Sequence, residues 1–132
     1  TAGALTKVKR WVVDQYDNEF IVMNGDTISD VDLAEMRHLQ VLKNPVVTIF
    51  TKDSIIHNGG AFIFDEKIFN YIPESKPYSI HEDLLPDLIK RKIPIGLYKS
   101  NDNYFDLGTP EKLEKARRFF EGKNEKKFNY LP

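Results

Sequence analysis

An uninterrupted apolar run that stops at an Asn-Gly-Asp turn is the feature that most constrains this chain. Residues 20–23 are Phe, Ile, Val and Met, and Asn24, Gly25 and Asp26 follow directly. A continuous rather than alternating apolar run is typical of a strand buried on both faces, as in a parallel sheet. Because Asn-Gly is a turn signal, we expect Asp26 just past the carboxyl end of a strand. In open α/β sheets that edge is where ligands bind.

The carboxylate of Asp26 has two interpretations. Beside a glycine that permits close approach of a ligand, it is a natural ligand for Mg²⁺ that carries phosphates. Alternatively, it only caps the turn in which it lies. These seven residues alone do not separate the two interpretations.

Composition excludes several classes of protein. The 132 residues suit one domain or part of one, and the formal net charge of -1 gives no basic excess for binding nucleic acid or a membrane surface. The chain has no cysteine, which excludes disulfides, thiolate zinc sites and cysteine nucleophiles. No apolar run approaches the roughly 20 residues of a membrane span and no signal peptide opens the chain, so we expect a cytoplasmic protein. The first residue is Thr1, which indicates that the true start lies elsewhere.

Two segments have the periodicity of amphipathic helices. The first is expected to end at residues 17–18, and the second to begin at a cap formed by Ser29 or Asp30 and to end before Pro45. A buried strand is expected at residues 46–50, and a parallel strand–helix–strand unit is the simplest connection. The apolar stripes of the two helices consist of Leu5, Val8 and Val12, and of Leu33, Met36 and Leu39 with an extension to Val41 and Leu42.

The second half of the chain carries further capping signals. Ser79 and Glu82 have the spacing of a capping box. Thr109 followed by Pro110 predicts the start of a last helix, because proline fits the first helical position. Asp106 directly precedes this start at the end of an expected strand, which gives the chain a second carboxylate beside a glycine.

An ordered set of five motifs resembles the sugar-1-phosphate nucleotidylyltransferases, also called nucleotide-sugar pyrophosphorylases. The motifs span nearly the whole chain, although each one alone is weak. They are Thr-Ala-Gly-Ala-Leu at residues 1–5, Val-Met-Asn-Gly-Asp at 22–26, Asn-Gly-Gly-Ala-Phe at 58–62, the segment 79–86, and Phe-Asp-Leu-Gly-Thr-Pro-Glu at 105–111.

This resemblance implies a Rossmann-like three-layer α/β/α fold with a mainly parallel sheet. It also implies transfer of a nucleotidyl group from an NTP to a sugar 1-phosphate, with Mg²⁺ as cofactor. Carried over position by position, the family's roles fall on three sets of residues. The nucleotide contacts are Ala2, Gly3, Asn24 and Gly25; the sugar-phosphate contacts are Asn58, Gly59 and Gly60; the Mg²⁺ ligands and catalytic carboxylates are Asp26 and Asp106.

The chain departs from the family's pattern in two places. The glycine-rich loop that cradles the triphosphate is not in the sequence, and neither is the sugar-contacting hairpin expected between residues 50 and 58. We expect residues 1–122 to be the C-terminal part of the family domain, with a segment omitted near residues 52–57, and residues 123–132 to be a polar tail.

The motifs favour one substrate pair without fixing it. The Asn-Gly-Gly element and the Tyr-Phe-Asp-Leu-Gly-Thr-Pro ending resemble guanylyltransferases for heptose or mannose 1-phosphate most closely. Thymidylyl- or uridylyltransferases for glucose 1-phosphate are the alternative. A non-catalytic regulatory subunit with this fold and an unrelated α/β phosphate-binding domain are further readings. The expected partners are the NTP and the sugar phosphate, with no nucleic acid or membrane, and self-association is left open.

Overall fold

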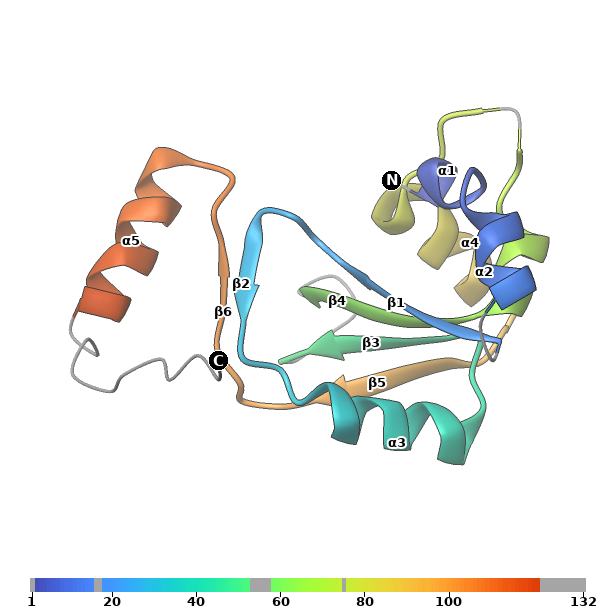
Figure 1. The fold of residues 1–132 in the computed structure, drawn as a ribbon, viewed down its shortest axis with the longest axis horizontal. Coiled ribbons are helices and arrows are strands. Elements are labelled where there is room, and N and C mark those ends of the chain that lie inside the picture. Colours follow the sequence, from blue (N-terminus) through green and yellow to red (C-terminus); the bar gives the residue numbers. More distant parts are fainter. Residues whose placement is uncertain (1, 16–17, 53–57, 75, 122–132) are drawn as a thin grey trace.

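The structure is a computed structural model that describes residues 2–15, 18–52, 58–74 and 76–121. A four-stranded sheet in the order β1-β4-β3-β5 lies at its centre (Figure 1). Strands β1 (Glu19–Met23), β3 (Val47–Thr51) and β5 (Ile95–Lys99) run in one direction, and β4 (Asn58–Asp65) runs in the other. The expected parallel relation of β1 and β3 is therefore present, but β4 lies between them and pairs with both.

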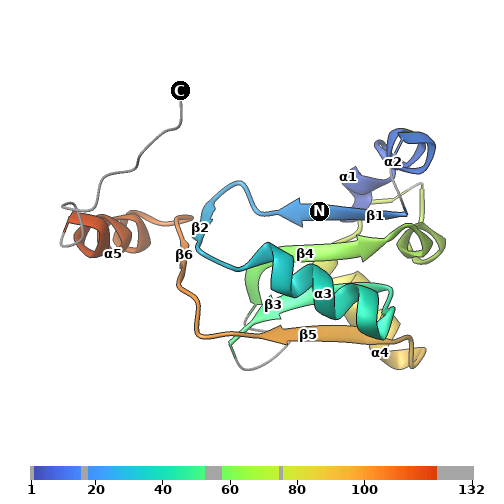
Figure 2. The ribbon, with the colours of Figure 1, turned by 60° about the horizontal axis from the view of Figure 1, so that its bottom comes forward.

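Helices cover both faces of this sheet (Figure 2). Helix α3 (Leu33–Lys43) lies on one face, where Met36 packs with Phe50, Ala61 and Ile63. The other face carries the larger core cluster, including Phe62, Phe64 and Leu88, and is covered by the remaining helices. These are α1 (Ala2–Leu5), α2 (Lys9–Gln15), η1 (Glu66–Tyr71), η2 (Ile80–Leu84) and α4 (Leu85–Lys90). The expected three-layer α/β class is confirmed, and three of the four strands of the sheet share one direction, although β4 is antiparallel to both of its neighbours.

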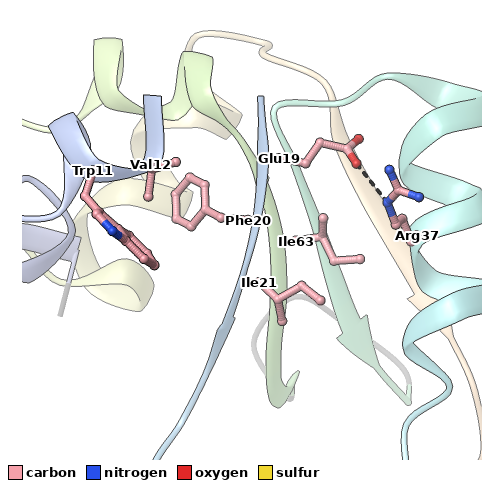
Figure 3. A pocket seen from close by; sticks show the side chains of 7 residues that line it. All are labelled: Trp11, Val12, Glu19, Phe20, Ile21, Arg37 and Ile63. Atoms are coloured by element: carbon pink, nitrogen blue, oxygen red, sulfur yellow. Dashed lines mark hydrogen bonds and ion pairs between the residues drawn. The ribbon is translucent and has the colours of Figure 1, made fainter. Parts of the chain in front are cut away.

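Strand β1 lies at the edge of the sheet, so the expectation that it is buried on both faces is wrong. Ile21 and Met23 are 48% and 46% exposed, whereas every residue of β3 is buried. A groove of about 360 Å³ follows the free edge of β1, with Trp11 and Phe20 on one side of the strand and Ile21 and Arg37 on the other (Figure 3). A continuous apolar run therefore identified both strands but could not tell the central one from the edge one.

The single N-terminal helix that periodicity predicts is divided in two. Residues 6–8 form a turn between α1 and α2, where the Thr6 hydroxyl donates to the carbonyl oxygen of Gly3 at 2.9 Å. A side chain that hydrogen-bonds to the preceding turn competes with helix continuation. Val12 is buried as expected, but Val8 is 41% exposed because the break rotates it away from the sheet.

Helix α3 begins later than the sequence indicates. Its cap is Asp32, whose Oδ1 accepts hydrogen bonds from the backbone N–H groups of Ala34 and Glu35, both at 3.0 Å. The expected caps, Ser29 and Asp30, are displaced because residues 27–29 form a short strand instead. The buried stripe holds Met36 and Gln40, and the predicted extension is wrong, since Val41 and Leu42 are 60% and 70% exposed.

The capping box before α4 forms in a modified way. The Ser79 hydroxyl accepts from the backbone N–H of Glu82 at 3.2 Å, as predicted. The Ser79 N–H in turn donates to the carboxylate of Asp83, at 2.7 Å, rather than to that of Glu82. The reason is that the first turn is a π-helix (η2), which brings the residue four positions on back over the cap.

A small arm lies across the end of the sheet (Figure 1). It consists of the two-stranded pair β2 (Thr27–Ser29) and β6 (Tyr104–Asp106), followed by helix α5 (Pro110–Glu121). Phe105 packs on Phe119 and Phe120, with ring centroids 4.6 and 5.6 Å apart. Helix α5 begins at Pro110, as predicted. None of the helices in the described part of the chain is long and apolar enough to cross a membrane.

Candidate functional site

The two aspartate motifs, 80 positions apart in the chain, meet at one end of the arm. In the antiparallel pair of β2 and β6, Thr27 lies opposite Asp106. The backbone N–H of Leu107 donates to the carbonyl oxygen of Asp26 at 2.7 Å. Asp26 lies three residues beyond Met23, the last residue of β1, and directly before β2, so it stands between the carboxyl end of β1 and the arm. Asp106 belongs to the arm rather than to the main sheet, and reaches this point through the β2–β6 ladder.

Gly108 lies between the two carboxylates. A Cβ atom at this position would be 3.1 Å from Oδ1 of Asp106 and 3.6 Å from Oδ2 of Asp26. Both side chains therefore turn toward the same small space, which the missing side chain of Gly108 leaves open. The N–H of Gly108 also donates to Oδ1 of Asp106 at 2.8 Å, which fixes the direction of that carboxylate.

Lys112 contacts the second oxygen of Asp106. Its Nζ lies 2.6 Å from Oδ2, and the two side chains are 51% and 48% exposed. The hydrogen bond from Lys112, and next that from Gly108, hold the pKa of the Asp106 carboxyl below its ordinary value. Asp106 is therefore ionised at neutral pH, as a metal ligand must be.

Asn24 and Gly60 join the first strand to the fourth at the carboxyl end of β1. The N–H of Asn24 donates to the carbonyl oxygen of Gly60 at 2.8 Å. Gly60 has a φ of +72°, and a Cβ atom there would lie 2.9 Å from Nδ2 of Asn24 and 3.1 Å from Oγ1 of Thr27. Only glycine fits this position without displacing Asn24. Asn24, Gly25, Asp26 and Gly60 are thus brought together.

The other two members of the Asn-Gly-Gly element lie differently. A Cβ atom on Gly59 would be 2.2 Å from Cδ1 of Phe50, so Gly59 is required by packing against this buried ring. Asn58 opens β4 opposite Thr51, and its side chain lies outside what the structure describes. The predicted contact of these two residues with a sugar phosphate remains a prediction.

Ala2 and Gly3 lie in α1, against a loop that follows η1. Ala2 is fully buried. The N–H of Gly3 donates to the carbonyl oxygen of Tyr78 at 3.0 Å, and a Cβ atom on Gly3 would touch the backbone of Lys76 and Tyr78 at 3.4 Å. The small residues therefore serve close packing of α1 in this structure. Their predicted role at the nucleobase stays a prediction.

The donor set at Asp26 and Asp106 suits one kind of metal. No group of three or more His, Asp or Glu side chains that could hold a metal exists among the described residues, so this part of the chain offers the carboxylates of Asp26 and Asp106. Mg²⁺ is commonly bound through one or two carboxylates together with substrate phosphates and water. A closed structural site for zinc or calcium would need more protein ligands. The residues therefore fit a Mg²⁺ ion that arrives with a phosphate-bearing substrate.

Sequence reasoning did not single out Thr27, Gly108 or Lys112 as parts of this site. The sequence pattern predicts Thr109 as a helix cap and marks Gly108 only as a glycine near Asp106, and the charge of Lys112 looks like any exposed lysine of a first helical turn. The available signal was the short stretch from Asp106 to Lys112: Lys112 lies six residues after Asp106, in the first turn of α5, and from there its side chain reaches back to the aspartate.

Comparison with known proteins finds relatives that are nucleotidyltransferases of sugar 1-phosphates. The chain is 24% identical over 141 residues to the UTP–glucose-1-phosphate uridylyltransferase of Synechocystis sp., which covers 82% of this chain and 36% of that protein. It is 27% identical over 146 residues to the D-glycero-alpha-D-manno-heptose 1-phosphate guanylyltransferase of Aneurinibacillus thermoaerophilus. This match covers 89% of this chain and 61% of that protein. The chain thus spans about a third to three fifths of these relatives. No family model matches it.

A solved structure supports the fold. The structure of a putative glucose-1-phosphate thymidylyltransferase from Bacillus anthracis superposes with a TM-score of 0.76. The superposition covers 98% of this chain and 63% of the other, at 16% sequence identity. At that identity the likeness speaks for the fold.

Proposed function

We propose, since this chain is a relative of the sugar-1-phosphate nucleotidyltransferases, that it carries the carboxylate half of a nucleotidyl-transfer site. The substrates would be an NTP and a sugar 1-phosphate, and the products an NDP-sugar and pyrophosphate. The observation that carries the proposal is the convergence of Asp26 and Asp106 on the space beside Gly108. Two carboxylates without a third protein ligand suit a cation shared with a polyphosphate.

The reaction needs positioning and charge neutralisation more than acid–base chemistry. A phosphate oxygen of the sugar 1-phosphate attacks the α-phosphorus of the NTP in line. The new P–O bond joins the two substrates, and the bond to the bridging oxygen breaks, so pyrophosphate leaves with that electron pair. Bound Mg²⁺ would neutralise charge on the phosphates. Asp26 and Asp106 would hold the ion, and the rigid link between Asn24 and Gly60 would fix the Asp26 turn.

The preferred substrates are GTP with a manno-configured sugar 1-phosphate, heptose or mannose. The Asn-Gly-Gly element and the guanylyltransferase relative support this pair. The uridylyltransferase relative supports the alternative, UTP or dTTP with glucose 1-phosphate. A panel of four NTPs with three sugar phosphates separates these choices by the nucleotide sugar formed.

The test of the carboxylates replaces each by its neutral isostere. In the complete protein, which would also carry the triphosphate-binding loop, we expect Asp26→Asn and Asp106→Asn to lower turnover by at least about 100-fold with Mg²⁺ present, because removing a charge that stabilises the transition state costs about this much. Product formation is measured by chromatography and pyrophosphate release. Asp14→Asn is the matched control, because Asp14 lies on α2 and pairs with Arg10. Full activity in either site variant would contradict the metal assignment.

A non-catalytic role predicts a different result in the same experiment. A complete protein that binds Mg²⁺ and NTP through Asp26 and Asp106 but gives no NDP-sugar with any pair would be a binding or regulatory unit.

A further inference from the structure

Lys112 occupies the place beside Asp106 that a metal ion would need. Both oxygens of this carboxylate already have a donor: Gly108 N–H at 2.8 Å on Oδ1 and Lys112 Nζ at 2.6 Å on Oδ2. An ammonium group and a divalent cation repel each other at such distances. Direct metal coordination through Oδ2 is therefore disfavoured while Lys112 stays in contact with this oxygen.

The position of Lys112 is set by the start of helix α5. Its backbone N–H points to the Thr109 hydroxyl at 3.4 Å, and Pro110 fixes the first helical residue. The lysine therefore sits in the first turn, where its side chain can reach back to Asp106. Cations are disfavoured in the first turn by the helix dipole, so the pairing with Asp106 gives this charge a compensating partner.

We propose that Lys112 is a tethered counter-ion, which holds the Asp106 carboxylate in place and competes with Mg²⁺ for it. The inference rests on the proposed function, since it takes Asp26 and Asp106 as the metal ligands. Because both side chains are about half exposed, the ion pair is weak and can be exchanged for a divalent ion. Binding of a divalent ion by Asp106 would release the Lys112 ammonium, which would then be free to interact with a substrate phosphate.

Binding of Mn²⁺ to the intact chain, followed by the electron paramagnetic resonance of the free ion, tests this competition. Removing the competing charge in Lys112→Met should tighten Mn²⁺ binding about two- to fivefold, the range that corresponds to an exposed ion pair. Lys112→Arg should bind like the wild type, because it keeps a cation that reaches the carboxylate. Lys115→Met is the control for a general change in charge, because Lys115 lies on the same helix and lines a separate surface with Glu111 and Glu114.

The outcomes separate this inference from the proposed function. Equal affinities in Lys112→Met and Lys115→Met, or weaker binding in Lys112→Met, would overturn the competition while leaving the metal site intact. Two outcomes would overturn the metal site and this inference with it: no Mn²⁺ binding by the wild type, or equal Mn²⁺ affinities of the wild type and Asp26→Asn. A purely structural role of Lys112 predicts no gain in metal affinity.

Discussion

At the scale of single residues, Gly60 ties the backbone of β4 to the Asp26 turn. Its φ of +72° and the 2.9 Å approach of a Cβ atom to Nδ2 of Asn24 leave no room for a side chain. We expect Gly60→Ala to lower the free energy of unfolding by about 1–3 kcal/mol, because it adds backbone strain and displaces Asn24. Chemical denaturation measures this change.

Gly25 provides the matched control for Gly60. A Cβ atom on Gly25 would meet nothing within 4 Å, and its φ is not in the left-handed range. Gly25→Ala should therefore leave stability within about 0.5 kcal/mol. Equal losses in the two variants would contradict the close contact of Gly60 with Asn24. A separate loss of nucleotide affinity in Gly25→Ala would support the predicted nucleotide contact of this residue.

The sequence predicted the residues of the site better than their surroundings. Asp26 and Asp106 could be selected because each follows an apolar strand and lies beside a glycine. The approach of the two aspartates to one space could not be derived, because it depends on β2, a three-residue strand without a periodicity of its own. The ion pair of Lys112 was missed for a related reason, since nothing in local sequence distinguishes a paired lysine from a solvated one.

At the scale of elements, β1 pairs with β4 alone within the described residues, which leaves its other edge unpaired there and lined by apolar side chains. Unpaired backbone groups and exposed Ile21 and Met23 make this edge a template for another strand. We expect the chain to self-associate at high concentration and Ile21→Lys to reduce this association, because charge on an edge strand opposes pairing. Sedimentation velocity over a concentration series measures the change.

Leu42→Lys is the control for the edge variant, because Leu42 is 70% exposed on α3 and does not line the groove along β1. It should leave association unchanged. A wild type that stays monomeric across the series, or an equal effect of both lysines, would contradict a role of the β1 edge. Ile21→Lys should alter the free energy of unfolding by less than about 1 kcal/mol, since the side chain is already half exposed.

Element boundaries were predictable where a side chain defines them. Thr109 and Pro110 gave the start of α5, and Ser79 gave the start of the helical segment before α4. The prediction failed where tertiary pairing decides: residues 27–29 were taken as the approach to a helix, but Asp106 and its neighbours pair with them as a strand. The expectation that β1 and β3 are joined as a simple parallel unit failed for a similar reason, because β4 lies between them in the sheet.

At the scale of the whole molecule, the arm and the sheet differ in how they are held. The sheet lies between two core clusters, whereas the arm rests on a ladder of three residue pairs and on the packing of α5 against Phe105. Tyr104 connects the two parts, since its ring lies 5.9 Å from that of the buried Phe50. Local opening requires little loss of buried surface in such an arm.

We therefore expect the amides of α5 and β6 to exchange with solvent through openings that cost at least about 2 kcal/mol less than those of β3 and β4. Hydrogen exchange followed by NMR measures both sets in one sample, and β5 serves as the control because it belongs to the same sheet as β3. Addition of Mg²⁺ and NTP should raise protection in the arm more than in the sheet, since Asp106 ends β6 and Asp26 precedes β2. Uniform protection across the arm and the sheet would show that they open as one unit, and the binding of an ion between Asp26 and Asp106 would then leave no local signature.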